Sequence, residues 1–360
     1  MTEFQTRKDD FSATRLVDTQ AKAVNDGDVL LAVNQFAFTA NNITYAVMGE
    51  QIRYWEFFPP AGDNAEQWGI IPVWGFATVT ESKCPEIAVG ERLFGYFPPA
   101  DTLLITPTRI TDATLFDGAA HRAELPPGYN VYRRVAGEPN YDSAMDNERM
   151  LLFPLHITSF CLHDMLQDNN WFGAEQVIII SASSKTSIGL AYALDEDESS
   201  PAVVGLTSSR NLDMVKSLSI YDSATTYDEL ESIDATLPTV IVDMSANGEV
   251  LGRLHTHLGD NMRFCSNVGL THWEEARPGP GFIQERSEMF FAPGHIQKRM
   301  KDWGPAGFDQ RSSGFIQRTA MKSREWMEVK SIDGLQGLSE VYDDVCNGRV
   351  PASHGLVVSL

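Results

Sequence analysis

Four short apolar runs, separated by segments with helical spacing, constrain the fold of this chain more than any other feature. The runs are Gln176–Ile180, Ala202–Leu206, Thr239–Asp243 and Met262–Ser266. Between them, apolar residues recur every three or four positions in Ser187–Leu194, Leu212–Leu218 and Val250–Leu254. Strands that alternate with helices of this length form right-handed β-α-β units around a parallel sheet. The middle of the chain therefore predicts a doubly wound α/β domain.

The first third of the chain has a different pattern. Strand-like runs at Val29–Val33, Gly69–Thr80 and Arg92–Phe97 are separated by Gly, Pro, Asn and Asp at short spacing. This pattern predicts a small β-rich domain with a partly open barrel, and no helical periodicity interrupts it. At 360 residues the chain exceeds the usual size of a single core, so we expect two domains.

The last part of the chain contains two segments with different patterns. A helix is expected at Gly337–Val345 and a final strand at Gly355–Ser359. The stretch His272–Lys330 is rich in Gly, Pro, Arg and aromatic residues and follows neither rhythm.

Charge and cysteine content exclude several classes of function. With 49 acidic against 28 basic residues, the formal charge of −21 opposes binding to nucleic acid or to an anionic membrane. No apolar run is long enough to span a membrane, and the first residues lack the apolar stretch of a signal peptide, so we expect a cytoplasmic protein. The four cysteines lie far apart, which argues against a structural zinc site and a disulfide framework.

The segment Ser181–Gly189 follows the first apolar run and opens a helix, where a dinucleotide-binding turn lies in a Rossmann domain. Small residues there let the backbone approach the pyrophosphate, and the helix N-terminus offers N–H groups to its charge. Against the pattern G-x-x-G-x-x-G, the turn keeps only the last glycine, with Ser183 and Thr186 in the other two places. A small-residue turn in another α/β fold remains an alternative. The candidate cofactor contacts in the turn are Ser183, Ser184, Lys185, Thr186 and Ser187.

The residues after the second apolar run favour NADP(H) over NAD(H). An NAD-specific site usually places an acid there to bind the ribose hydroxyls, but Thr207–Asn211 contains none. Ser208 and Arg210 are suited instead to a 2′-phosphate, through charge-assisted hydrogen bonds. The alternative is that Arg210 is an ordinary surface residue at a helix start.

Four segments carry a resemblance to a known superfamily. Gly27–Val33 looks like an early G-x-V-L-V-x-V strand, Val89–Gly95 like a V-G-D-R-V-x-G turn, and Leu155–Phe160 like an L-x-x-T-A-Y segment; Gly337–Val350 is similar to a final helix and G-R-x strand. In this order they resemble the medium-chain dehydrogenase/reductase superfamily, especially its zinc-free quinone reductase and enoyl reductase branches.

The resemblance implies an α/β fold class of two domains. Residues 1–150 and 320–360 would form a GroES-like β-rich catalytic domain, and residues 151–319 a Rossmann domain with a doubly wound parallel sheet. It also implies a homodimer. No metal is expected, because Ala37–Tyr45 and Pro72–Ala77 lack the Cys and Gly-His-Glu of zinc-dependent members.

Without a metal, a side chain must hold or protonate the oxyanion that develops during hydride transfer. In the zinc-free branches this role belongs to Tyr, Asn or Thr in the segment that matches residues 41–54. We expect Tyr45 to act as acid or oxyanion donor, Asn42 and Thr44 to orient the substrate, and Tyr54 to be the second choice for the acid. A packing or capping role is the alternative for each.

Further cofactor contacts follow from the order of the elements. Thr158 matches a family threonine near the nicotinamide, while Ser266 and Asn267 are expected at the nicotinamide ribose or carboxamide, and Tyr227 on the adenosine side. The aromatic and basic residues of Phe290–Arg299 suit either an acidic substrate or CoA phosphate, or the cover of a domain junction.

The sequence thus predicts an NADP(H)-dependent oxidoreductase that acts on a small molecule. Reduction of an activated C=C bond, in an enone or enoyl thioester, is favoured, because an isolated carbonyl is harder to polarise without a Lewis acid. A carbonyl reductase or alcohol dehydrogenase of the same fold is an alternative. A non-catalytic dinucleotide-binding sensor is another, since most glycines of the turn are replaced.

Overall fold

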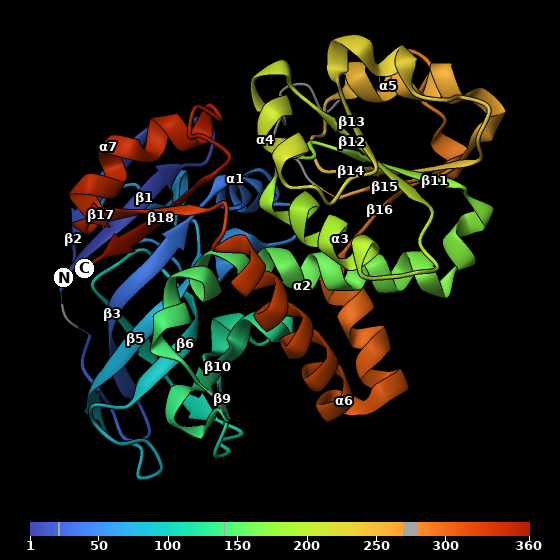
Figure 1. Ribbon diagram of the computed structural model, residues 1–360. Coiled ribbons are helices and arrows are strands. Elements are labelled where there is room, and N and C mark those ends of the chain that lie inside the picture. Colours follow the sequence, from blue (N-terminus) through green and yellow to red (C-terminus); the bar gives the residue numbers. More distant parts are fainter. Residues whose placement is uncertain (21, 140, 269–278) are drawn as a thin grey trace. The chain divides into compact units, whose positions relative to one another are not determined.

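The computed structural model describes residues 1–20, 22–139, 141–268 and 279–360 (Figure 1). The chain forms two compact units, one of Met1–Leu151 with Met327–Leu360 and the other of Leu152–Trp326. The first is rich in β-strands and the second contains a parallel sheet with helices, so the predicted fold class is confirmed.

Two sheets form the first unit, and both ends of the chain contribute to the larger one. The order of its main strands is β17-β18-β3-β5-β6-β10-β9-β8, with β7 paired to β3. Strand β18 pairs antiparallel with β3, with Leu356 opposite Phe38, so the expected C-terminal strand completes a sheet begun near the N-terminus. The bounds are β3 (Val29–Phe38), β5 (Val73–Ser82), β6 (Arg92–Phe97), β7 (Thr102–Ile105), β8 (Pro107–Thr108), β9 (Thr114–Asp117), β10 (Val131–Arg134), β17 (Glu328–Asp333) and β18 (His354–Ser359). The smaller sheet has the order β2-β1-β4, with β1 (Thr2–Arg7), β2 (Thr14–Asp18) and β4 (Trp68–Gly69).

Among the described residues, α1 (Ala40–Val47) and α7 (Gly334–Cys346) are the α-helices that lie wholly within this unit. The expected C-terminal helix is α7, whereas α1 lies in the third of the chain where no helical periodicity is visible. A capping box begins α1: the backbone N–H of Thr39 donates to Asn42 Oδ1 at 2.7 Å. Helix α1 is too short for a repeating apolar pattern, so its start depends on this local bond.

A buried ion pair fixes the loop between β9 and β10. Arg122 is 1% exposed, and its Nη1 donates to Asp117 Oδ2 at 2.8 Å and to the Tyr132 hydroxyl at 3.1 Å. Its Nη2 donates to the carbonyl of Tyr129 at 2.8 Å, and Asn130 Nδ2 donates to the Arg122 carbonyl at 3.0 Å. The guanidinium therefore joins the turn at Pro127–Asn130 to both flanking strands.

The second unit is built on a parallel sheet with the order β13-β12-β11-β14-β15-β16. All four predicted apolar runs are strands in it. The bounds are β11 (Gln176–Ile180), β12 (Ala202–Thr207), β13 (Ser223–Thr226), β14 (Thr239–Asp243), β15 (Met262–Asn267) and β16 (Ser287–Met289). The helices are α2 (Asp146–Asp168), α3 (Lys185–Asp195), α4 (Leu212–Ser217), α5 (Gly248–Leu258) and α6 (Ala292–Ser323).

Alternate residues of β11, a central strand of this sheet, point to opposite faces. Val177 and Ile179 pack in a core with Leu162 of α2 and Ile188 of α3. Ile178 and Ile180 pack in a second core with Leu254 and other residues of α5. Figure 1 shows α2 and α3 on one face and α5 on the other. Burial on both faces explains why β11 is a continuous apolar run rather than an alternating one.

The stretch after β15 contains a long helix that the sequence pattern does not predict. His272 lies outside the described residues, but α6 occupies much of the remainder and bends at Gly304, where φ is +73°, just before Pro305. Figure 1 shows the two arms of α6 meeting at this bend. The buried apolar residues of α6 lie in the second arm, Phe308 and Phe315 among them, whereas the first arm buries Arg299, so no single apolar period runs through the segment.

Loss of the Arg122 guanidinium should destabilise the first unit strongly. In Arg122→Met, Asp117 would stay buried without its partner, and the free energy of unfolding should fall by about 3–5 kcal/mol. Urea unfolding followed by circular dichroism measures this. Arg349→Gln is the control, because it breaks an exposed ion pair with Asp344 and should barely move the midpoint. Equal midpoints for Arg122→Met and the unmodified protein would contradict the role of the ion pair.

Candidate active site

Most predicted cofactor residues gather at one edge of the parallel sheet. Strands β11, β12, β14 and β15 are parallel neighbours, so the segments that follow them leave the sheet at the same edge. In doubly wound folds this carboxyl edge is where ligands bind. It collects the turn after β11, the residues after β12 and the end of β15, which contain Ser183, Ser184, Lys185, Thr186, Ser187, Ser208, Arg210, Ser266 and Asn267.

The turn after β11 lacks two of the motif glycines, and hydrogen bonds of its serines hold it in place. Ser181 adopts a left-handed conformation, with φ of +63°, which favours glycine. Ser183 is buried, and its hydroxyl accepts from Asn211 Nδ2 at 3.0 Å. Ser184 caps α3 by accepting from the N–H of Ser187 at 3.1 Å, and Ser187 is fully buried. The side chain of Ser183 and the backbone N–H of Ser187 are therefore engaged within the protein.

Lys185 is the first residue of α3 and carries its charge in an unfavourable place. Burial lowers the pKa of Lys185 to about 8. The helix dipole also places partial positive charge at this end, which disfavours a cation and favours an anion. A bound phosphate would relieve both effects. Lys185 and the partly exposed Thr186 are thus suited to an anionic ligand.

Gly189, the one glycine of the motif that remains, lies where α3 approaches α2. A Cβ at this position would be 2.6 Å from Ser159 Oγ and 2.7 Å from His156 Cδ2. Ser159 Oγ also donates to the carbonyl of Thr186 at 2.7 Å. Helix α2 therefore holds the first turn of α3 directly, and only glycine permits the approach.

The other cofactor candidates of this unit have varied surroundings. Arg210 is exposed in the 3-10 turn Ser209–Asn211, and Ser208 precedes it. The Tyr227 hydroxyl bonds to Ser181, and burial, with the nearby Asp243 carboxylate, raises the pKa of Tyr227 to about 12. Tyr227 therefore contacts the turn itself.

Thr158 and the end of β15 complete the set. Thr158 Oγ1 donates to the Pro154 carbonyl of α2 at 3.0 Å. Ser266 is 1% exposed, whereas Asn267 is partly exposed and its Nδ2 donates to the Glu288 carbonyl at 3.5 Å. Ser266 and Asn267 lie at the edge that Ser184 and Lys185 occupy.

In the first unit, both candidate acids belong to a group of four tyrosines, Tyr45, Tyr54, Tyr96 and Tyr129, which we call the tyrosine cluster. The rings of Tyr45 and Tyr54 have centroids 4.7 Å apart, as do those of Tyr96 and Tyr129. The cluster joins α1, β6, the turn Tyr54–Glu56 and the turn Pro127–Asn130. The sequence predicts Tyr45 and Tyr54 as site residues but not Tyr96 and Tyr129, since no spacing links these distant positions.

Three hydroxyls of the cluster, those of Tyr45, Tyr54 and Tyr129, are hydrogen-bonded, and all four remain protonated. Tyr45 accepts from Trp74 Nε1 at 3.3 Å and from the side chain of Asn41. The hydroxyl oxygens of Tyr54 and Tyr129 are 2.8 Å apart. Burial raises the pKa of all four tyrosines. The cluster therefore supplies hydrogen-bond donors and acids rather than bases.

Asn42 and Thr44, the predicted substrate-orienting residues, lie on α1 beside Tyr45. Asn42 is 3% exposed, its Oδ1 bonds the N-cap and its Nδ2 donates to the Pro72 carbonyl at 2.9 Å. Its amide thus holds α1 against the segment before β5, which favours the capping alternative. Thr44 is partly exposed.

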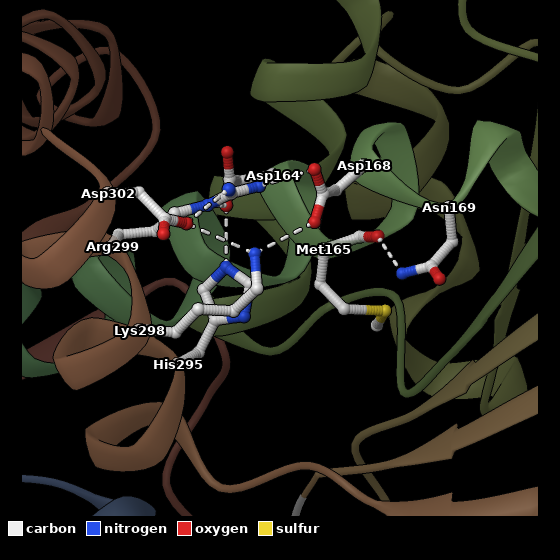
Figure 2. Close-up of polar contacts among 8 residues, drawn as sticks. All are labelled: Asp164, Met165, Asp168, Asn169, His295, Lys298, Arg299 and Asp302. Carbon is white, nitrogen blue, oxygen red and sulfur yellow. Dashed lines mark hydrogen bonds and ion pairs between the residues drawn. The ribbon is translucent and has the colours of Figure 1, made fainter.

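The basic residues of α6 are compensated by acids (Figure 2). Arg299 is 8% exposed and bonds Asp164 at 2.5 Å and Asp168 and Asp302 each at 3.0 Å. Lys298 lies 3.0 Å from Asp168, and His295 lies 2.5 Å from Asp164. The charges join α6 to α2 within the second unit, so the structure favours packing over an acidic substrate or CoA phosphate.

Comparison with solved structures defines the class of fold. The chain superposes on CurA from Vibrio vulnificus, solved in complex with NADPH, with a TM-score of 0.65, 11% identity and coverage of 100% of this chain and 99% of that one. The quinone oxidoreductase from Thermus thermophilus, also solved with NADPH, gives 0.55, 13% identity and coverage of 100% of both chains. JamJ enoyl reductase gives 0.56, 10% identity and coverage of 96% and 95%.

The fold is therefore that of the quinone oxidoreductases and enoyl reductases, and the predicted superfamily resemblance is confirmed for the fold. The chain belongs to the family described as "Protein of unknown function (DUF2855)", whose model matches residues 36–351. No curated protein matches the sequence. In the part of the chain that the structure describes, no helix has the length and apolar character needed to cross a membrane.

Substitution of the retained glycine should disturb the contact between α2 and α3. In Gly189→Ala the new methyl group would clash with Ser159 and His156, and we expect a loss of about 1–3 kcal/mol in unfolding free energy. Gly314→Ala is the matched control, because its Cβ would meet nothing closer than Arg318 Nη1 at 3.8 Å within α6. The control should be neutral or stabilising by up to about 1 kcal/mol. Thermal unfolding of both variants checks the expectation, and a Gly189→Ala variant as stable as the control would refute it.

Proposed function

We propose that this protein is an NADPH-dependent oxidoreductase that reduces an activated C=C bond in a small molecule. The observation that carries the proposal is Lys185, a cation of lowered pKa at the N-terminus of α3, where a phosphate would offset its unfavourable position. The neighbours CurA and the Thermus quinone oxidoreductase, each solved with NADPH, support the same cofactor.

The residues of the carboxyl edge fit a dinucleotide with a 2′-phosphate. Lys185 and the first turn of α3 would hold the pyrophosphate, and Ser208 and Arg210 would hold the 2′-phosphate. Thr158, Ser266 and Asn267 are proposed on the nicotinamide side and Tyr227 on the adenosine side. When bound, this cofactor supplies a hydride.

The tyrosine cluster would supply the donors that hydride addition to a conjugated C=C bond requires. Addition at the β-carbon leaves negative charge on the carbonyl oxygen of the substrate. Tyr45, whose oxygen accepts two hydrogen bonds, keeps its own proton for such an oxygen. Because the hydroxyls stay protonated, they donate at neutral pH.

Two alternatives use the same residues. A carbonyl reductase would need the same donors at the oxygen, but hydride would add to the carbonyl carbon itself. A dinucleotide sensor would use the carboxyl edge alone. Turnover of NADPH with an enone, compared with an isolated ketone, separates all three.

The homodimer implied by the resemblance remains part of this proposal.

Direct titration tests the cofactor preference. Following nucleotide fluorescence, we expect NADPH to bind more tightly than NADH. Arg210→Ala should weaken NADPH by about 10-fold or more, by loss of a charged hydrogen bond, and leave NADH nearly unchanged. Arg318→Ala, which removes an exposed arginine paired with Glu196, is the control and should change neither. Equal losses for both nucleotides in Arg210→Ala would refute the 2′-phosphate contact.

The pKa of Lys185 predicts a pH dependence of NADPH affinity. Below pH 8 the lysine is charged and binding should be strongest. Above pH 8 binding must take up a proton, so the affinity should fall, by at most about tenfold per pH unit. Fluorescence titrations between pH 7 and pH 10 measure this. Lys185→Met should bind more weakly at pH 7 and lose the alkaline fall, whereas an unchanged fall in this variant would exclude Lys185 as the phosphate contact.

A further inference from the structure

The tyrosine cluster contains a hydroxyl pair that the proposed function leaves unexplained. Tyr54 and Tyr129 have hydroxyl oxygens 2.8 Å apart, and their rings meet edge to face with centroids 5.6 Å apart. In such a pair one hydroxyl donates, and the proton of the other stays available for a different acceptor. The direction of this one bond decides which tyrosine can give a proton away.

Tyr129 is the more firmly held member of the pair. Its carbonyl accepts from the buried Arg122 at 2.8 Å, and its ring packs on Tyr96 at 4.7 Å and Phe57 at 5.3 Å. Tyr54 lies beside Tyr45, with ring centroids 4.7 Å apart. The three side chains thus form a series in which Tyr54 stands between Tyr45 and Tyr129.

We propose that Tyr129 is a positioning residue, which donates its hydroxyl proton to the Tyr54 oxygen so that Tyr54 is the proton donor of the reaction. This inference rests on the proposed function and deepens it. It assigns Tyr45 to the substrate oxygen and Tyr54 to the proton, and it restricts the substrate to a C=C bond conjugated with a carbonyl group.

The directions of the pKa shifts agree with this assignment. The hydrogen bond between the two hydroxyls opposes the rise in the Tyr54 pKa that burial causes, whereas it adds to the rise in the Tyr129 pKa. Tyr54 is therefore the member of the pair that loses a proton more readily.

The proton transfer balances. After a hydride has added to the β-carbon of an enone, the electron pair of the C=C bond lies on the α-carbon and the carbonyl oxygen. The O–H bond of Tyr54 breaks, its proton forms a C–H bond at the α-carbon, and the electron pair stays on the Tyr54 oxygen. Tyr129 keeps its proton and stabilises this phenolate, which water then reprotonates. The substrate gains one hydride and one proton.

Kinetics with 2-cyclohexenone and NADPH test the assignment. Tyr129→Phe should lower kcat by about 10- to 100-fold, because one hydrogen bond to a charged oxygen is lost, with little change in either KM. Tyr54→Phe should lower kcat further. The double variant should equal Tyr54→Phe alone, since Tyr129 acts through Tyr54. Tyr342→Phe is the matched control: it deletes a buried hydroxyl that bonds Thr6 in the same unit and should leave kcat unchanged.

A second measurement does not depend on turnover. 4-Nitrophenolate resembles an enolate, and its visible absorbance reports its binding to a cluster of hydroxyl donors. We expect it to bind the unmodified protein and Tyr342→Phe equally, and Tyr129→Phe about 10-fold more weakly.

The outcomes separate the two proposals. An unchanged kcat in Tyr129→Phe, or effects of Tyr54→Phe and Tyr129→Phe that add in the double variant, would overturn the role of Tyr129 while the reductase function stands. If the unmodified protein binds NADPH but does not reduce the enone, the reductase function fails. The 4-nitrophenolate titration then decides alone, and equal or absent binding in the unmodified protein and Tyr129→Phe would overturn the inference.

Discussion

Parallel pairing of β11 with β12 and β14 is the constraint on which the cofactor proposal depends. Parallel strands end at a common edge of the sheet. The strand pairing alone therefore brings together segments that are far apart in sequence. The N-terminus of α3 lies at this edge, and its partial positive charge favours an anion. Lys185 adds a charge at this point and its pKa falls to about 8. A cation in this position is understandable if a phosphate binds beside it.

The turn after β11 keeps its backbone conformation although it lacks most of the motif glycines. Neighbouring segments hold the serine-rich turn by hydrogen bonds: Asn211 donates to Ser183, and the hydroxyl of Tyr221 donates to the carbonyl of Ala182 at 2.7 Å. Tyr227 bonds to Ser181, the residue with positive φ. These contacts compensate for the strain of a non-glycine residue in the left-handed region, which costs of order 1–3 kcal/mol. Gly189 alone remains glycine, because α2 leaves no room there for a Cβ.

The parts of the fold that sequence could predict are those in which burial leaves a local pattern. Strand β11 is buried on both faces and reads as an unbroken apolar run, so its prediction was confirmed. Helix α1 begins with a capping box around Asn42 and has no long period, and α6 bends at Gly304, so neither was predicted. The cause in both cases is a local backbone effect rather than hydrophobic periodicity.

The candidate site also has one part that the sequence could predict and one part that it could not. Residues of the turn after β11 follow from their place after a strand, whereas Tyr129 reaches Tyr54 across 75 positions. The charges of α6 are a similar case: Arg299 meets Asp164 across 135 positions, so sequence left open whether Lys298 and Arg299 bind a ligand. Partners at such separation depend on the tertiary fold, which composition and spacing do not encode.

The electrostatics of the tyrosine cluster limit the chemistry it can support. Ionisation of Tyr45 would raise the pKa of Tyr54, and ionisation of Tyr54 would raise that of Tyr129, because their hydroxyls share a poorly solvated volume. The cluster can therefore accommodate one negative charge at a time. Hydride addition to a conjugated C=C bond creates one such charge, which passes from substrate to protein when the proton moves. The fully buried ring of Tyr96 packs edge to face on Tyr45, with centroids 5.7 Å apart, and adds to the burial of the cluster. In buried surroundings each hydrogen bond to a developing negative charge is stronger than in water, so the same burial that raises these pKa values makes the hydroxyls effective donors.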